Sequence, residues 1–341
     1  MAQETSRKVR AEAAVVVCSD AGWAWQGAYV LARSMALDQS GRLDHHAYLV
    51  GEVPEELLSV FPEGVTVHHL TDYPRAFHYD ASAHVPAATM LRLFALEDLA
   101  PDYRRVIYLD GDVYQAWGSL ADLLDLPETG RPLAAVRNRS HWPDRGRLHQ
   151  QRAYVAALHP GIGANYFNAG VLVVNGPVWA EGALSAAALD FFVRNPGLCR
   201  FGDQSALNAV VAGNWDSLSP GWNWQISQSS YLMLQGRRPR LVHFTGPIKP
   251  WTDRLRLFDP AIYRDMKRFL HDRGQAHLLD SQAGPDGFTL DMERRRMRAL
   301  AHLADDPLGK REVVKLFLDA PAHVDLAAGI AAYGVGAAGS D

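Results

Sequence analysis

The chain has 341 residues, of which 48% are hydrophobic and 21% are charged. This is ordinary globular composition with enough apolar residues for a sizeable core, in one large domain with an appendage or in two domains. The formal net charge of −4 excludes nucleic-acid binding through bulk positive charge. The sequence has neither about 18 uninterrupted apolar residues nor an apolar N-terminal stretch, so we expect no membrane-spanning helix and no signal peptide.

The two cysteines, Cys18 and Cys199, both stand in apolar surroundings and fit no metal-binding spacing. A disulfide between them is one alternative. Buried free thiols in a reducing compartment are the other, and we favour this second interpretation. We therefore expect a cytoplasmic protein.

The first part of the chain alternates short apolar segments with helical patterns. Residues 1–12 are polar and are expected to form a disordered leader. We predict strands over Ala13–Cys18, His46–Val50 and Val65–Leu70, and helices over Trp25–Asp38 and Pro54–Val60. This alternation predicts an α/β fold with a mostly parallel, mixed sheet flanked by helices. The glycine patterns of dinucleotide-binding and P-loop proteins are absent, so nucleotide binding by those devices is not expected.

The middle of the chain continues the same pattern. We predict strands over Val106–Leu109, Leu133–Val136, Tyr166–Asn175 and Leu241–Phe244, and helices over Ala87–Leu99, Ala183–Arg194 and Gln204–Val211. Between Arg137 and Leu158 the chain is unusually polar and basic. A solvated surface is the first interpretation of that run, and a loop that faces an acceptor or a phosphate is the alternative.

From residue 259 onward the pattern changes to basic amphipathic helices, predicted over Tyr263–Leu279 and Leu290–Leu303. Surface helices are the first interpretation, and peripheral attachment to an anionic membrane, at its inner face, or to a partner is the second. The predicted organisation is an α/β domain over residues 13–258 and a helical C-terminal extension over residues 259–341 with a flexible tail.

The most informative stretch is Val106–Val113, an apolar run that ends in Asp110, Gly111 and Asp112. Ligands of open α/β sheets bind beyond the carboxyl ends of the strands, where these two carboxylates are expected. Carboxylates at i and i+2 suit Mg²⁺ or Mn²⁺, and the glycine allows a tight bend. An Asp-Gly turn that only closes a strand is the alternative.

A second element, Leu241–Trp251, combines a strand-terminal histidine with a glycine and a lysine. His243 can supply a third metal ligand through a neutral imidazole nitrogen. Gly246 lets the backbone approach a phosphate, and Lys249 offers a mobile cation to the same group. A lone histidine in an apolar strand would more often be a core residue, whereas the three residues together indicate a diphosphate-binding segment.

Two further elements suit a ligand rich in hydroxyl groups. Small residues follow Asn168, whose amide can both donate and accept hydrogen bonds. Asp203 and Gln204 stand at a predicted helix start, where helix capping by itself would explain the acid.

Together these segments resemble the retaining glycosyltransferases of family 8, the group of glycogenin and of bacterial lipopolysaccharide galactosyl- and glucosyltransferases. The His-Phe-Thr-Gly-x-x-Lys-Pro-Trp segment is the most specific match. The matching pieces follow the family's order over about residues 13–255 and are Met90–Leu93, Val106–Asp112, Tyr166–Asn175, Asp203–Asn208 and His243–Trp251.

The resemblance implies a GT-A type fold, a UDP-sugar donor and a Mn²⁺ ion, with Mg²⁺ as the alternative ion. It places the metal on the two carboxylates of the DxD motif, Asp110 and Asp112, and on His243. It makes Arg92, Asp203 and Gln204 the candidate catalytic residues. The donor-binding residues that it implies are Cys18, Ser19, Asp20, Arg92, Asp110, Gly111, Asp112, Asn168, Ala169, Asp203, Gln204, His243, Gly246 and Lys249.

Three places depart from the family's usual residues. Ser205 stands where an aspartate is usual. Arg137 and Asn138 stand where the family often has an aspartate that reaches the sugar. Gly22 and Trp23 replace the usual Asn-Tyr. We therefore expect an unusual donor sugar or acceptor.

The expected reaction moves a hexose, glucose or galactose, from a UDP-sugar to a hydroxyl of a glycan, a lipopolysaccharide or a small glycoside, with retained anomeric configuration. A covalent glycosyl intermediate requires a carboxylate nucleophile. Gln204 is an amide, and Asp203 is the other candidate, so we favour attack on the same face as the departing phosphate. A non-catalytic UDP-sugar-binding protein and a metal-dependent nucleotidyltransferase are the alternative functions.

The acceptor is expected to contact Arg137–Asn165 and residues 220–235. Aromatic residues in the second segment suit stacking on sugars, and a core role is equally compatible with each of them. These residues are Trp222, Trp224 and Tyr231.

Overall fold

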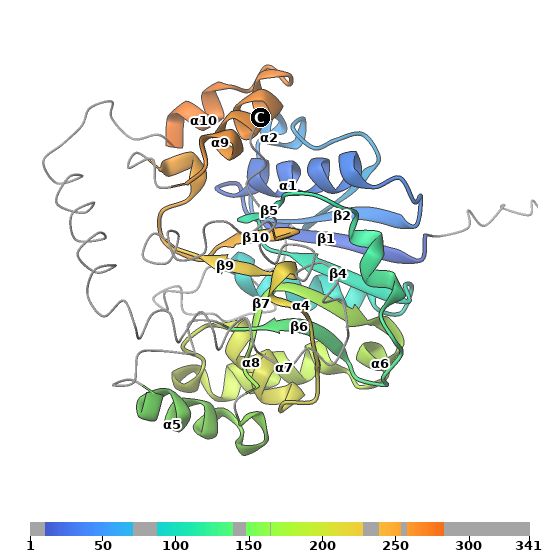
Figure 1. The fold of residues 1–341 in the computed structure, drawn as a ribbon, viewed down its shortest axis with the longest axis vertical. Coiled ribbons are helices and arrows are strands. Elements are labelled where there is room, and N and C mark those ends of the chain that lie inside the picture. Colours follow the sequence, from blue (N-terminus) through green and yellow to red (C-terminus); the bar gives the residue numbers. More distant parts are fainter. Residues whose placement is uncertain are drawn as a thin grey trace, which may run out of the picture.

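The computed structural model describes residues 11–70, 87–138, 148–163, 165–227, 239–253 and 258–282. In these ranges helices cover both faces of a central sheet, giving three layers (Figure 1). The α-helices are α1 (Ala24–Leu37), α2 (Glu55–Leu58), α4 (Ala87–Leu99), α5 (Leu148–Leu158), α6 (Gly176–Glu181), α7 (Leu184–Arg194), α8 (Asp203–Val211), α9 (Pro260–His271) and α10 (His277–Gln282). The helices α1, α9 and α10 lie on one side of the sheet, and α4 to α8 lie on the other.

The central sheet is mixed, as predicted. Its strands, in spatial order, are β3 (Val65–Leu70), β2 (Leu43–Val50), β1 (Ala13–Ser19), β4 (Arg105–Leu109), β7 (Phe167–Asn175), β6 (Leu133–Arg137) and β8 (Asp216–Ser217). The first four strands are parallel, whereas β7 runs antiparallel to both β4 and β6. The reversed strand brings the start of β7 to the same edge as the end of β4.

A second, smaller sheet joins the chain just after β4 to a distant segment. It consists of β5 (Val113–Gln115), β10 (Leu241–Phe244) and β9 (Trp224–Ile226), in the order β5-β10-β9. The backbone N–H of Val113 donates to the carbonyl of Asp110 at 3.1 Å, which closes a turn between β4 and β5. The apolar run that leads into Asp110 therefore ends in a turn, and Val113 already belongs to the other sheet.

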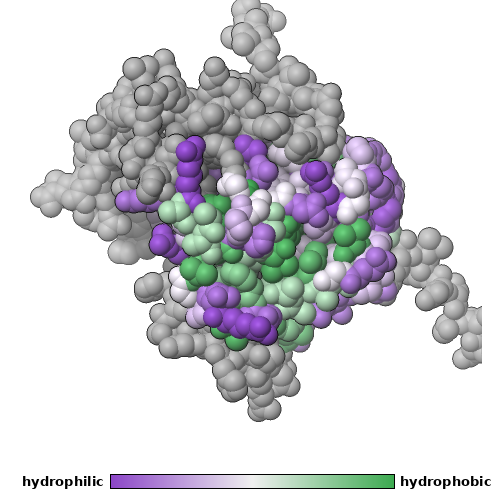
Figure 2. Space-filling model, turned by 90° about the horizontal axis from the view of Figure 1, so that it is seen from below, coloured by the Kyte–Doolittle hydropathy of each residue, from purple (hydrophilic) through white to green (hydrophobic). Residues whose placement is uncertain are grey.

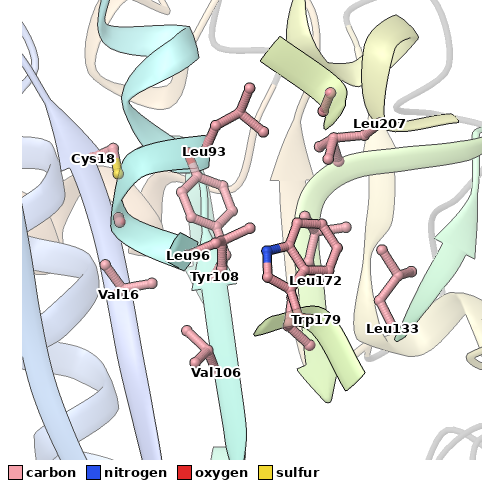
Figure 3. Packing of buried hydrophobic residues seen from close by; sticks show 14 of the residues in the cluster. Val16, Cys18, Leu93, Leu96, Val106, Tyr108, Leu133, Leu172, Trp179 and Leu207 are labelled. Atoms are coloured by element: carbon pink, nitrogen blue, oxygen red, sulfur yellow. The ribbon is translucent and has the colours of Figure 1, made fainter. Parts of the chain in front are cut away.

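The buried strands are apolar on both faces because helices cover the sheet from both sides. Val15 and Val17 of β1 belong to the core on the α1 side, and Val16 belongs to the core beneath α4. Figure 3 shows this second core, where Tyr108 and Leu172 of the sheet lie among side chains of the covering helices. The predicted strands β1, β4 and β7 are fully buried.

The C-terminal helices pack on α1. Tyr29 meets Phe269 edge to face with ring centroids 5.3 Å apart, and Arg33 of α1 forms an ion pair with Asp265 at 2.7 Å. The prediction of one helix over Tyr263–Leu279 is wrong, because the chain turns after α9 at Gly274, whose φ is +71°. The boundary at residue 259 stays a prediction, and Leu290–Leu303 lies outside the described residues.

No helix within the described ranges is both long enough and apolar enough to cross a bilayer. Cys18 and Cys199 are free and buried, so the disulfide alternative is wrong. Burial raises the pKa of the Cys199 thiol to about 12, which keeps it protonated at neutral pH.

Burial of His45 in β2 predicts that stability depends on pH. Its Nε2 lies 2.9 Å from the Ser34 hydroxyl of α1, and burial lowers the pKa of His45 to about 4 although Asp38 and Asp44 oppose the shift. An unfolded histidine has a pKa of about 6.5, so the unfolded chain binds more protons between these values. We expect the unfolding free energy to fall by up to about 3 kcal/mol through this residue as pH drops from about 6.5 to 4.

Urea unfolding of wild type and His45→Gln at pH 7 and pH 4.5 measures this contribution. Glutamine can keep a hydrogen bond to Ser34 and does not titrate, so the variant should lose less stability than wild type between the two pH values. An equal loss in the two proteins would show that His45 does not carry the effect.

Candidate active site

The sheet topology explains why separated motifs meet at one edge. The backbone N–H of Asp110, just after β4, donates to the carbonyl of Gly170 at 2.9 Å. Because β7 is antiparallel to β4, its first residues, Asn168 and Ala169, lie beside the end of β4. Two of the predicted elements are thus joined by backbone pairing.

The three-stranded sheet places His243 at the same edge. Val113 of β5 pairs with His243 of β10, and the N–H of Phe244 donates to the carbonyl of Asp112 at 3.1 Å. This pairing sets the His243 ring beside the two carboxylates. The histidine is 4% exposed, yet its ring faces polar groups rather than a hydrocarbon core.

Asp110, Asp112 and His243 form a candidate metal site. One ligand atom from each lies within 4.8 Å of the others. His243 Nε2 is 3.1 Å from Asp112 Oδ1 and 3.7 Å from Asp110 Oδ2. The Asp112 Oδ1 atom is buried and receives no hydrogen bond, which a metal ion would compensate. Two hard carboxylates and one imidazole fit a divalent cation such as Mn²⁺ or Mg²⁺.

Lys249 lies on the other side of Asp112. Its Nζ is 2.5 Å from Asp112 Oδ2 and also donates to the carbonyl of Phe244. Burial alone would raise the pKa of Asp112, but the charges of His243 and Lys249 hold it well below its usual range. Asp112 is therefore a carboxylate at any pH near neutrality.

Arg92 of α4 contacts three separate segments of the site. Its Nε pairs with Asp203, its Nη2 lies 3.1 Å from Asp110 Oδ1, and its Nη1 donates to the carbonyl of Ala169. The guanidinium also lies over the Tyr108 ring at 4.4 Å. Burial lowers the pKa of Arg92, but the neighbouring carboxylates more than offset this and raise it. The side chain, 5% exposed, holds three protein segments in place.

Asp203 is the first residue of α8 and is fully buried. Its explanation as a helix cap is wrong, because Gly202, with φ +57°, occupies the N-cap position. Burial raises the pKa of Asp203 to about 7, while Arg92 acts in the opposite direction. The Arg92 guanidinium therefore favours the charged form of this buried carboxyl group.

The amides beside β7 have defined orientations. Gln204 Oε1 accepts from the N–H of Ala169 at 3.0 Å, and its Nε2 donates to the Tyr166 hydroxyl at 3.4 Å. Ser205, which replaces the family's aspartate, bonds instead to the Tyr154 hydroxyl of α5 at 2.8 Å. The departure at Ser205 thus serves a contact between α8 and α5.

The predicted donor-binding residues at the end of β1 differ in exposure. Ser19 is buried, and the Cys18 side chain packs in the core beneath α4. Asp20 is more accessible and accepts from the N–H of Gly22 at 2.9 Å. Gly111 has no left-handed φ, so the predicted tight bend does not require glycine, but a Cβ there would lie 3.5 Å from the Trp23 ring.

Two residues of the site were not predicted as such: the sequence marked Trp23 only as a departure from the family and did not single out Asn223. Trp23 is 37% exposed, meets Trp251 edge to face at 5.5 Å, and has Lys249 Nζ 5.7 Å from its ring centroid. Its position directly after β1 is the signal that could have found it. Asn223 is buried and bonds to His243, and nothing in the local sequence marks it.

Trp222 and Trp224 are each 3% exposed and lie in the core, whereas Tyr231 lies outside the described residues. Gly246 is buried in the turn after β10. From the basic run, the Arg137 Nη2 donates to Asn165 Oδ1 at 3.0 Å. The basic side chains of residues 139–147 lie outside the described residues.

A cleft of about 450 Å³ lies away from the metal-site residues, between α5 and η4 (Pro196–Leu198). One of its lining residues is Tyr154, whose hydroxyl forms a hydrogen bond with Ser205. The same side of the molecule carries an apolar area bordered by hydrophilic residues (Figure 2). The lining residues are Gln150, Ala153, Tyr154, Ala157, Gly197, Leu198 and Arg200.

Comparison with known proteins gives a family. The model of glycosyl transferase family 8 matches residues 49–254. The chain belongs to this family. General stress protein A of Bacillus subtilis is 28% identical over 65% of this chain and 75% of its own length. The lipopolysaccharide 1,2-glucosyltransferase of Escherichia coli is 27% identical over 48% of this chain, and the match spans 49% of that enzyme.

The galactosyltransferase LgtC, solved with donor and acceptor sugar analogues, has the same fold. The structures agree with a TM-score of 0.60 over 83% of this chain and 99% of that chain, at 18% identity. The predicted GT-A type fold and the family resemblance are therefore confirmed, and the chain is a glycosyltransferase by family.

The burial of Arg92 and Asp203 predicts a large cost for breaking their pair. Arg92→Met leaves two carboxylates without their cation, and we expect the unfolding free energy to fall by about 3–5 kcal/mol. Adding Asp203→Leu removes one uncompensated charge, so the double variant should lose less than the two single variants together. Urea unfolding at pH 7 measures all three.

The exposed pair Arg194–Asp190, at 2.8 Å on α7, provides the control. Arg194→Met should cost about 0.5 kcal/mol or less, because exposed helix pairs contribute little. If Arg92→Met costs no more than this surface substitution, the buried pair does not have the structural role described above.

Proposed function

We propose that the chain is a retaining hexosyltransferase that moves glucose or galactose from a UDP-sugar to an acceptor hydroxyl. The observation that carries the proposal is the cluster of Asp110, Asp112 and His243 with Lys249 beside it. A divalent cation and a lysine side by side are suited to the two phosphates of a nucleoside diphosphate.

Asp110, Asp112 and His243 would hold Mn²⁺, with Mg²⁺ as the alternative. When bound, the ion would neutralise negative charge on the departing UDP. Lys249 would leave Asp112 for a phosphate oxygen, and the buried Gly246 would let the backbone approach the same group. A cation that meets charge as it develops stabilises the transition state more than the ground state.

The donor sugar would lie against the start of β7 and the start of α8. Asn168, Ala169 and Gln204 would line it, with Asp203 and Arg92 behind them. Arg92 donates to Asp110 and Ala169 and forms an ion pair with Asp203, so its proposed effect on the sugar acts through the groups that it holds.

The nucleoside would lie at the end of β1. Ser19 and Asp20 would approach the ribose and base, with the backbone of Cys18 beside them. Trp23 adds an exposed aromatic face next to Gly111, and such a face suits a planar base. The free thiols support a reaction in the cytoplasm.

The stereochemistry follows from the residues near the sugar. The Gln204 amide is a poor nucleophile, and its oxygen already accepts the Ala169 N–H. Asp203 is fully buried and paired with Arg92, which disfavours it as a nucleophile at an anomeric carbon. We therefore favour attack by the acceptor on the face from which UDP departs, with a phosphate oxygen accepting its proton.

The acceptor is proposed to be a glycan, a lipopolysaccharide or a small glycoside. Arg264, Lys267 and Arg268 on the outward side of α9 support peripheral contact with an anionic membrane as an accompanying proposal.

A donor screen tests the function. Purified protein is incubated with UDP-glucose or UDP-galactose, with and without Mn²⁺, and candidate glycoside acceptors, and UDP release is measured. We expect metal-dependent UDP release and an α-linked product from an α-linked donor. A β-linked product would refute retention, pyrophosphate release would indicate a nucleotidyltransferase, and binding without transfer or donor hydrolysis would indicate a non-catalytic protein.

Asp110→Asn tests the metal site. Loss of one carboxylate ligand should lower kcat roughly a thousand-fold, since a bound metal contributes several kcal/mol to transition-state stabilisation. Asp190→Asn, a change of the same kind on the exposed surface of α7, should leave kcat unchanged. Unaltered turnover in Asp110→Asn would remove this residue from the site.

A further inference from the structure

The orientation of the His243 ring decides whether it can bind a metal. An imidazole coordinates through the nitrogen that carries a lone pair, and the proton sits on the other nitrogen. Here Nε2 faces Asp110 and Asp112, while Nδ1 faces Asn223 at 3.0 Å. The partner of Nδ1 therefore controls which nitrogen is available to a metal ion.

The hydrogen-bond directions follow from one backbone group. The N–H of Gly170 can only donate, and it lies 3.0 Å from a side-chain atom of Asn168, which must be the amide oxygen. Asn223 approaches this same oxygen at 2.8 Å, so the approaching atom must be its NH₂ group. The oxygen of Asn223 is then the atom that faces His243 Nδ1, and Nδ1 must carry the proton.

Burial leaves this chain of bonds little freedom. Asn223 is 0% exposed, His243 is 4% exposed and Asn168 is 7% exposed. Turning either amide would bring two donors or two acceptors together, which is costly in a buried site. The ring packs closely against Gly170 of β7, since a Cβ at this residue would lie only 2.1 Å from His243 Cε1.

We propose that Asn223 is a positioning residue that fixes the ring and the tautomer of His243, so that the Nε2 lone pair faces the metal. The same chain of bonds occupies the Asn168 oxygen twice. Asn168 can therefore only donate hydrogen bonds, through the N–H groups of its amide. Its partner on the donor sugar is then an oxygen that accepts a hydrogen bond. This inference rests on the proposed function, since it assigns the metal and the sugar to that site.

The test uses metal-free and metal-titrated full-length protein. Proton–nitrogen correlation spectra of histidine-labelled, metal-free protein report the tautomer, with His243 identified by the signal lost in His243→Ala. Mn²⁺ affinity is measured by calorimetry with the metal alone. We expect Nδ1 to carry a proton in wild type, an unprotonated Nδ1 in part of the molecules of Asn223→Ala, and Mn²⁺ binding about 10- to 100-fold weaker in that variant.

Asn208→Ala is the matched control. Asn208 is 1% exposed and holds α8 to β7 through the N–H and C=O of Phe167, at 2.8 and 3.1 Å, without contacting the metal-site residues. It should lower thermal stability as a buried amide deletion does, yet leave the tautomer and the Mn²⁺ affinity unchanged. A purely structural role for Asn223 would make the two variants behave alike.

The outcomes separate the two proposals. Equal Mn²⁺ affinity in wild type and Asn223→Ala overturns the positioning role and leaves the proposed function standing. A wild-type ring whose Nδ1 carries no proton also overturns it, independently of metal. If wild type binds no Mn²⁺ or Mg²⁺ at all, the metal part of the proposed function fails together with this inference.

Discussion

Crowding of negative charge at one end of the sheet is the constraint on which the rest of the structure depends. Asp110, Asp112 and Asp203 approach one another at the end of β4, and Asp203 is fully buried. Repulsion among them in a medium of low polarity would be large. Arg92 offsets it for Asp110 and Asp203, and Lys249 offsets it for Asp112.

Each cation also binds backbone, and this links charge to fold. Arg92 donates to the carbonyl of Ala169 in β7, and Lys249 donates to the carbonyl of Phe244 in β10. The charges are therefore tied to the two sheets that bring the motifs together. An arginine suits the first position because its planar group serves several acceptors at once, whereas a lysine suits the second because it is a compact and movable charge.

Much of this could be predicted from the sequence, for identifiable reasons. The strands β1, β4 and β7 are continuous apolar runs, and the acid and amide residues follow or begin them, so their common edge could be inferred from α/β topology. The partner of His243 could not, because Asn223 reaches it through a pairing of short strands that no periodicity marks. Local patterns also failed at Gly274, where a single left-handed residue ends a helix whose amphipathic pattern continues, and at Asp203, whose partner lies on another helix.

The packing of Trp251 has a consequence for cooperativity. This side chain is 4% exposed and belongs to the cluster that α1 forms with α9 and α10, and it stands two residues after Lys249. Helices α9 and α10 therefore pack behind the segment that carries Lys249. Residues on either side of position 259 share one hydrophobic cluster. Helix α9 therefore cannot detach without exposing the face of α1 that packs against Trp251. Helices α9 and α10 should consequently melt in a single transition with α1, and they contribute to the rigidity of the segment that carries Lys249.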